Sequence, residues 1–197
     1  MNKKYLLALA VAFAVPVLAD NVALGKPVTI TGDVGVITCC WPDATVYPPA
    51  PLSSITDGVS LTEQTEWQDG TVWWDEFWPG SADNIIEINL NGLYRVTSVL
   101  IQADNNDVYG ISYRDAVGNW APLFNAPGIF PGFGMMTRTA PVGPVDATAF
   151  RIDASGGDAF YSVSEFQAQG TAVPEPSAWL AIAAGFGLIV FKRRVKQ

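Results

Sequence analysis

Apolar and polar residues alternate along several short segments in the middle of the chain. Four segments show this pattern, over residues 86–90, 99–103, 109–114 and 150–154. A period of two residues places successive side chains on opposite faces of a strand. Each segment therefore predicts a strand with one buried and one exposed face.

Turn-forming residues separate these segments. Asn91-Gly92 and Gly118-Asn119 are turn signals, and Gly and Pro recur every few residues between the ends of the chain. The same region lacks a sustained helical period. Short antiparallel strands joined by turns predict an all-β sandwich.

The beginning of the chain has a different composition. Lys3 and Lys4 precede an apolar run over residues 5–18, and the small residue Ala19 follows. This three-part pattern is typical of a secretory signal peptide that is cleaved off after Ala19. A membrane anchor is the weaker interpretation, because the run is short and Pro16 interrupts it. We expect residues 1–19 to be a signal peptide and the protein to be exported.

The end of the chain carries a second targeting pattern. Pro174, Glu175 and Pro176 precede a 14-residue apolar stretch, 178–191, and a basic tail. Basic residues beyond an apolar segment stay on the cytoplasmic side, and prolines prevent the helix from extending outward. An ordinary C-terminal anchor is the alternative, and it needs no Pro-Glu-Pro.

Residues 171–197 thus resemble the PEP-CTERM sorting signal. The resemblance implies a single apolar helix that lies transiently in the inner membrane, and an exosortase-type processing enzyme as partner. Processing would occur near Pro174, Glu175 and Pro176. The protein would then be a membrane-anchored precursor, later moved to the cell envelope or extracellular matrix of a Gram-negative-type bacterium.

Composition narrows the possible chemistry. The chain has no His, so it cannot contain a Ser-His-Asp triad, a Cys-His pair or an imidazole metal ligand. Between residues 20 and 173, eighteen Asp and Glu stand against five Lys and Arg, a net charge of −13. Such a body repels nucleic acid, whereas neutral ligands and divalent cations remain compatible with it.

Several short motifs follow one another in a recognisable order. They lie at residues 21–29, 55–58, 65–67, 85–90, 94–101, 109–113, 118–120, 150–152 and 164–166. Their order and spacing resemble the discoidin, or coagulation-factor type C, family of galactose-binding-like domains over residues 20–170. The resemblance implies an antiparallel jelly-roll β-sandwich that binds a ligand and does not catalyse.

The same resemblance implies one structural calcium ion. Its ligands would be the Asp of an Asp-Gly turn, a following Thr and a Glu of the last strand, which correspond to Asp57, Thr65 and Glu165. Thr62 competes with Thr65, because the Asp-Gly and the Thr are further apart here than in the family. Calcium takes six to eight oxygen ligands, which turn carbonyls can complete. Alternatively, Asp57 caps a turn and Glu165 is a surface charge.

An aromatic string, residues 73–78, is a candidate ligand-binding segment. Exposed rings of Trp73, Trp74 and Trp78 would stack on sugar, and Asp75 would accept hydrogen bonds from hydroxyls. The alternative is a strand with Trp74 and Trp78 inward, or rings that plug one end of the sandwich, because large aromatic side chains are mostly buried.

A polar cluster is the second candidate. Asp104 and Asp107 follow a predicted strand, Arg138 falls in a predicted long loop, and Asp158 follows two glycines. These residues either bind a ligand or tie the loops together through an ion pair between Arg138 and one of the carboxylates. The spacing after Asp104 does not fit an EF-hand, because Tyr109 stands where that loop requires Gly.

Adjacent Cys39 and Cys40 are the two cysteines of the chain, and they form either a strained vicinal disulfide or a link to another chain. Taken together, the sequence favours an exported, non-catalytic binding module for carbohydrate or extracellular polymer. A structural matrix protein without a specific ligand is the alternative. A small hydrolase with paired carboxylates is the weakest of the three interpretations.

Overall fold

The computed structural model describes residues 19–35, 45–76 and 84–174 and shows an all-β body with antiparallel pairing throughout these ranges. One short 3-10 helix, η1 (Leu52–Thr56), precedes the third strand. The strands are β1 (Asp20–Asn21), β2 (Val28–Thr31), β3 (Val72–Asp75), β4 (Ile85–Asp104), β5 (Val108–Arg114), β6 (Trp120–Ala126), β7 (Met135–Ser155) and β8 (Phe160–Ala172). The predicted all-β jelly-roll sandwich is confirmed.

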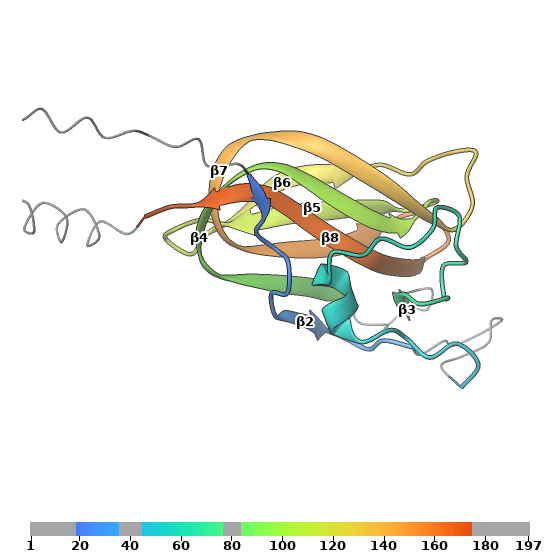
Figure 1. Ribbon diagram of the computed structural model, residues 1–197. Coiled ribbons are helices and arrows are strands. Elements are labelled where there is room, and N and C mark those ends of the chain that lie inside the picture. Colours follow the sequence, from blue (N-terminus) through green and yellow to red (C-terminus); the bar gives the residue numbers. More distant parts are fainter. Residues whose placement is uncertain (1–18, 36–44, 77–83, 175–197) are drawn as a thin grey trace, which may run out of the picture.

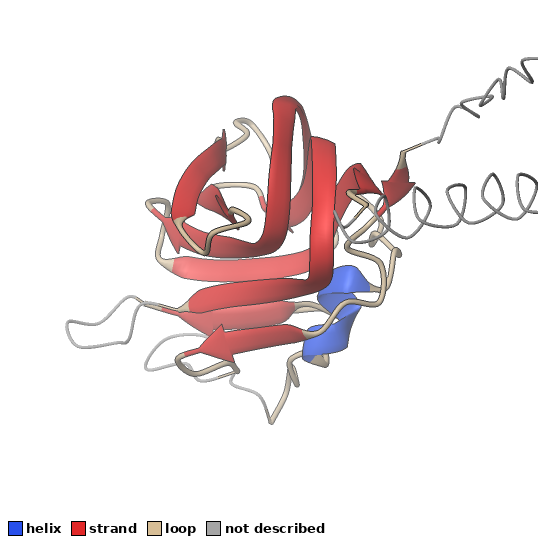
Figure 2. Cartoon of the chain, turned by 90° about the vertical axis from the view of Figure 1, so that its left-hand side faces the viewer, coloured by secondary structure: helices blue, strands red, loops and turns tan. Residues whose placement is uncertain are grey.

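Two long strands, β4 and β7, connect the layers of the sandwich. The first part of β4 pairs with β2 and with the last part of β7, which in turn pairs with β5. The last part of β4 lies between β8 and the first part of β7. Both strands therefore curve from one layer to the other, as Figures 1 and 2 show.

The turn predicted at Asn91-Gly92 is wrong. Both residues lie inside β4, where the register with β7 shifts between Asn89 and Tyr94. Asn91 has a positive φ of 54°, which produces an irregularity in a strand that continues. The turn at Gly118-Asn119 is confirmed, because it connects β5 to β6.

Alternation along the strands produces the core. Ile86, Ile88 and Leu90 are fully buried, and the predicted inward residues of the later strands join them in one cluster. Within it, the rings of Phe150 and Phe166 pack with centroids 5.1 Å apart. The sandwich thus encloses a single main core.

The two ends of the sandwich carry different features. At one end Asp20 pairs with Gly170, and Tyr94 of β4 lies opposite Ala172. At the other end β4 finishes at Asp104, beside the start of β7 and the loop over residues 127–134 (Figure 1). Ten residues of strand separate the two ends, which corresponds to about 30 Å.

Several predictions fall outside the described residues. These are the signal peptide, the Cys39-Cys40 pair, Trp78, Glu175 and Pro176, and the apolar stretch 178–191. Within the part of the chain that the structure describes, no helix is long and apolar enough to cross a membrane.

Candidate functional site

Arg138 organises the loops at the end of the sandwich where β4 finishes. It lies on β7, which corrects the predicted loop position, and it is 5% exposed. Its guanidinium donates hydrogen bonds to main-chain carbonyls from two separate segments, including those of Ala103 at 2.7 Å and Asp104 at 2.6 Å. The remaining acceptors are the carbonyls of Asn105, Asp107, Pro127 and Met136.

The predicted ion pair of Arg138 is therefore wrong. Among the described residues, the ion pairs join Arg95 to Asp146 and Arg114 and Arg151 to Glu87. The physical reason is local: the turn after β4 presents several carbonyls to one guanidinium, whose five donors form a fork. Arg138 ties the loops together as expected, but through the backbone.

A pocket of about 260 Å³ lies against this turn, and we call it the aromatic pocket. Its walls come from the turn after β4, the loop 127–134 and the segment around Trp67. Asp104 and Asp158, both in the predicted polar cluster, line it. The structure thus brings together residues from four separate segments of the chain.

Phe130 and Phe133 stand at this pocket with their rings in solvent, 72% and 55% exposed. The loop that carries them is fixed to the neighbouring turn, because Ile129 and Asn105 exchange hydrogen bonds of 2.7 and 3.1 Å. At its end Gly134 has φ +58°, and a Cβ there would overlap the carbonyl of Thr65. The exposed rings are therefore held in place rather than left on a free loop.

Neither phenylalanine is among the residues predicted from the sequence to bind a ligand. The available signal was the segment from 129 to 134, Ile-Phe-Pro-Gly-Phe-Gly, where two aromatic residues sit among Gly and Pro. Such composition predicts a loop rather than a strand, and a large apolar ring on a loop is a candidate contact residue.

The electrostatics of the aromatic pocket are unusual. Burial, with a smaller effect from Asp158, raises the pKa of Asp104 to about 6. Burial also raises the pKa of Asp107 to about 8, and the nearby Asp104 and Asp158 carboxylates add to the shift. Asp107 is fully buried; its Oδ2 accepts from the hydroxyl of Tyr109 at 3.3 Å, and its Oδ1 has no hydrogen-bond partner.

Two of the tryptophans predicted as stacking residues, Trp73 and Trp74, are buried. Both lie on β3 and have no exposed surface, which corrects the interpretation as exposed rings. The inward position of Trp74 agrees with the alternative of a strand, and Trp78 lies outside the described residues. Trp74 belongs to the main core, where it packs on Tyr161 with centroids 5.8 Å apart. Asp75 is half-buried at the end of the strand, opposite Phe160.

Trp73 faces the other side of β3 and builds a small second cluster. Its ring meets that of Trp67 edge-on, with centroids 5.7 Å apart, and Trp67 also packs on Phe160. Trp67 in turn lines the aromatic pocket. Trp73 therefore packs against a wall residue of the aromatic pocket.

Asp57 and Glu165, the first and last predicted calcium ligands, come close together. Glu165 is fully buried, which excludes the alternative of a surface charge, and neither of its carboxylate oxygens has a hydrogen-bond partner. Burial, with a smaller effect from the nearby carboxylate of Asp57, raises the pKa of Glu165 to about 7. Asp57 also accepts a hydrogen bond of 2.8 Å from the amide of Val59, as a turn cap does.

Glu165 belongs to a polar row that crosses three strands. It lies opposite Gln102 of β4, which lies opposite Thr137 of β7. The segment 57–63 crosses this row: the Gln102 side chain bonds both main-chain groups of Leu61, and Glu63 accepts from Thr137. The Glu165 oxygens have no well-formed hydrogen bond, although the Gln167 side chain and the Gly58 amide lower the pKa of this carboxyl. A buried carboxylate in this state suits a cation.

The two candidate threonines are engaged elsewhere. The hydroxyl of Thr65 donates to the carbonyl of Thr62 at 2.7 Å, and the carbonyl of Thr65 accepts from Met135. Nowhere in the described ranges do three acidic or sulfur side chains converge at metal-binding distance. A calcium ion would therefore take Asp57 and Glu165 together with carbonyl and water oxygens.

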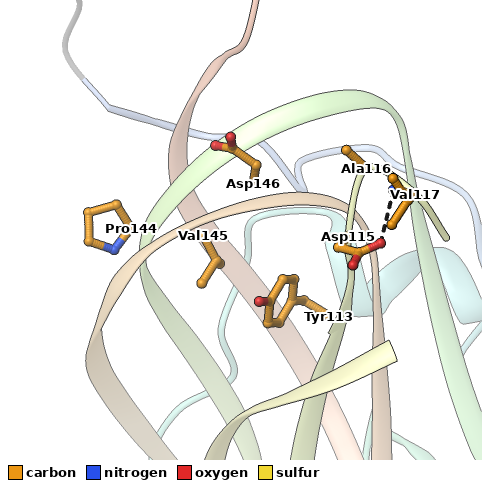
Figure 3. A pocket seen from close by; sticks show the side chains of 7 residues that line it. All are labelled: Tyr113, Asp115, Ala116, Val117, Pro144, Val145 and Asp146. Carbon is orange, nitrogen blue, oxygen red and sulfur yellow. Dashed lines mark hydrogen bonds between the residues drawn. The ribbon is translucent and has the colours of Figure 1, made fainter. Parts of the chain in front are cut away.

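A second pocket, of about 350 Å³, lies at the opposite end of the sandwich and is drawn in Figure 3. Its two carboxylates already have partners. Asp115 accepts from the amides of Val117 and Asn119, both at 2.9 Å, and Asp146 pairs with Arg95 at 2.8 Å. Neither carboxylate of this pocket is therefore available to a ligand, and the aromatic pocket is the better candidate.

The fold is that of the family 32 carbohydrate-binding modules. The module of NanJ from C. perfringens, solved in complex with galactose, matches with a TM-score of 0.50 and 18% identity, over 77% of this chain and 98% of that one. Chitosan-binding module 2 of a chitosanase/glucanase from Paenibacillus sp. IK-5, solved with chitotriose, matches with a TM-score of 0.50 and 18% identity. That match covers 75% of this chain and 98% of the other.

No protein-family model matches the sequence, and no curated protein matches it.

Proposed function

We propose that the body is a non-catalytic carbohydrate-binding module whose ligand occupies the aromatic pocket. The observation that carries this proposal is the pair of exposed rings, Phe130 and Phe133, fixed beside buried polar side chains. Sugar rings present apolar CH faces and hydroxyl edges. Aromatic faces accept the former, and carboxylate and amide groups bond the latter.

The shape of the pocket fits this role. Its volume of about 260 Å³ holds one or two sugar units, near the lower limit of small-molecule sites. It is open at the loops, so the remainder of a polymer can extend into solvent. One site of this size binds weakly, and several modules on one polymer then act together.

Binding of the full chain, in mild detergent, to a glycan array tests the proposal. We expect wild type to bind at least one class of saccharide, and the double variant Phe130→Ala with Phe133→Ala to bind it about thirtyfold more weakly, since each ring contributes about 1 kcal/mol. Val117→Ala removes an 81% exposed apolar side chain from the opposite end of the sandwich and is the matched control.

Two results would count against the proposal. An array on which no saccharide is bound favours the structural matrix protein, and binding that survives the double Phe substitution assigns the ligand to another surface.

We further propose that Asp57 and Glu165 hold a structural calcium ion. The support is the buried Glu165 carboxylate, whose two oxygens have no partner at good hydrogen-bond geometry and which lies beside a second carboxylate. A ligand that binds only the folded state stabilises it by mass action. Chelation is therefore expected to lower the melting temperature by about 5–10 °C.

The two side chains can be tested one at a time. Asp57→Asn and Glu165→Gln should each remove the calcium-dependent part of the melting temperature, whereas Asp115→Asn, at the opposite end, should retain it. A wild-type melting curve that is the same in calcium and in excess chelator would refute this site.

We propose that the protein is exported and sorted through its PEP-CTERM segment by an exosortase-type enzyme. The support is the order of Pro174-Glu-Pro176, an apolar stretch and a basic tail. Because β8 ends at the opposite end of the sandwich from the aromatic pocket, a body held through its C-terminus would present the pocket away from the membrane.

The mature chain is expected to begin at Asp20 and to end near Pro174–Pro176. Intact-mass measurement of the envelope or secreted fraction checks both ends. A dominant stable species that still carries residues 191–197 would exclude the processing and leave export unaffected.

A further inference from the structure

We propose that residues 57–67, which we call the strap, connect the cation site at Asp57 and Glu165 to the aromatic pocket, so that saccharide binding depends on calcium. This inference rests on the proposed calcium site and the proposed carbohydrate-binding function, and it adds a physical connection between them. The strap begins at one site and ends at the other: Asp57 is its first residue, and its last residue, Trp67, lines the pocket.

The strap has little packing of its own. It contains neither helix nor strand, and none of its side chains from 57 to 66 is buried. Val59, for example, is 65% exposed. A segment with few buried contacts opens locally at a low cost in free energy. The position of the strap therefore depends on the hydrogen bonds that hold it to the sheet and on the state of its two ends.

The first end of the strap carries one of two neighbouring carboxylates. Asp57 is exposed on the strap, whereas Glu165 is fully buried in β8. The two lie close enough for the charge of one to act on the other. Like charges in such a site repel each other unless a cation lies between them. Occupation of the site should therefore hold the first end of the strap against β8.

The middle of the strap is bound to β4 and β7. The buried side chain of Gln102 accepts from the amide of Leu61 at 2.7 Å and donates to its carbonyl at 2.9 Å. Two residues further on, Glu63 accepts from the amide and the hydroxyl of Thr137, and from Gln102 at 3.2 Å. Because Gln102 lies opposite Glu165 in the sheet, these hydrogen bonds are adjacent to the cation site.

The far end of the strap forms part of the aromatic pocket. The amide of Gln64 donates to the carbonyl of Met135, and the amide of Met135 donates to the carbonyl of Thr65, both at 2.8 Å. Gly134 packs so closely on the Thr65 carbonyl that a Cβ would overlap it, so a shift of the strap also shifts the adjoining loop. Since Gly134 and Trp67 both line the pocket, a displaced strap changes the pocket walls.

A cation at the first end therefore favours the arrangement in which the pocket is assembled. A ligand that binds the closed strap better than an open one shifts the population towards the closed state. The coupling is reciprocal, so saccharide in the pocket should tighten calcium binding by the same factor. We expect chelation to weaken saccharide binding about tenfold, which is within the range found for coupled sites.

Amide hydrogen exchange on the full chain, in mild detergent, follows the connection without any saccharide. The chain is compared in calcium and in excess chelator. We expect calcium to slow exchange of the Leu61, Met135 and Ile129 amides, because their hydrogen bonds hold the strap and the adjoining loop in place. The amides of Val117 and Asn119, in the hairpin at the opposite end, should exchange at the same rate in both conditions.

The glycan array, read in calcium and in excess chelator, measures the effect on ligand binding. Every saccharide that wild type binds in calcium should be bound about tenfold more weakly after chelation.

Variants of the strap contacts assign the effect to this segment. Glu63→Ala removes an exposed side chain and leaves both carboxylates of the cation site in place, so calorimetry should still detect calcium binding. The effect of calcium on the Met135 amide and on the array should nevertheless decrease. Gln102→Met removes the partner of Leu61 and should decrease it further. Asp69→Ala, an exposed carboxylate just beyond the strap, is the matched control for Glu63→Ala and should retain the full effect.

Several results separate the failure of this connection from failure of the two proposals on which it rests. Calcium binding without any change at the Met135 and Ile129 amides would overturn the connection and leave the calcium site intact. Equal array binding in calcium and in chelator, or a calcium effect undiminished in both variants, would overturn it as well. If calcium changes nothing, the calcium site fails together with this inference. If no saccharide binds, the proposed function fails, and the exchange rates alone decide whether the strap connects the two sites.

Discussion

Replacement of Trp74 by alanine is expected to lower the free energy of unfolding by about 3–5 kcal/mol. The side chain has no exposed surface, packs on Tyr161 in the main core and donates a hydrogen bond of 2.9 Å to Glu76. Truncation removes both the buried area and the packing around it. Trp73→Ala should cost a similar amount, because its ring fills the second cluster with Trp67. Urea unfolding monitored by circular dichroism measures both values.

Trp120→Ala is the matched control for these truncations. Trp120 is half-buried on β6, where its ring lies 4.0 Å below the guanidinium of Arg151, and its loss should cost roughly 1 kcal/mol. If Trp73→Ala and Trp74→Ala lose only as much unfolding free energy as Trp120→Ala, the rings of Trp73 and Trp74 are exposed. The stacking interpretation of residues 73–78 would then return.

The second large effect concerns Arg138. Arg138→Met preserves the length of the apolar stem but removes the donors from the carbonyls of two segments, so unfolding should become easier by about 3 kcal/mol or more. Because these carbonyls form the wall of the aromatic pocket, ligand binding should weaken as well. Arg138→Lys should recover only part of either loss, since a single ammonium cannot reproduce the fork.

Arg95→Met is the matched control for Arg138→Met, because it removes an exposed arginine instead of a buried one. Arg95 forms an exposed ion pair with Asp146, with the two side chains 57% and 36% exposed, so its loss should lower the free energy of unfolding far less than the loss of Arg138 does. If the two Met variants lose equal stability, Arg138 is not the tie between the loops that the hydrogen bonds indicate.

Local patterns predicted the strands but not their lengths. The alternation at 86–90 and 99–103 identified two buried faces, yet these segments form one continuous strand through Asn91 and Gly92. A turn signal reports the preference of a residue for positive φ, and pairing with β7 on both sides of Asn91 absorbs that conformation as a bulge. Sequence alone does not show which partner strand is present.

The candidate site residues were likewise only partly predictable from the sequence. The resemblance to the discoidin family predicted that Asp57 and Glu165 belong together, and the structure brings them together. The aromatic string was harder, because three Trp among acidic residues fit a loop or a strand, and the pairing of β3 with β8 decides for burial of Trp73 and Trp74. The aromatic pocket is lined by residues from four segments that are distant in the sequence. No local sequence pattern predicts that these segments lie close together.

The location of the bound ligand is the most direct test of the proposal that carbohydrate binds in the aromatic pocket. The isotopically labelled full chain, in mild detergent, is titrated with the saccharide that binds most tightly on the glycan array, and the amide NMR shifts are followed. If the ligand occupies the aromatic pocket, the largest shifts cluster in the segments 104–107, 129–134 and 156–158, while Asp115, Val117 and Asp146 at the opposite end stay unchanged. Saturable shifts confined to any other surface, or none at concentrations where the array shows binding, would contradict it.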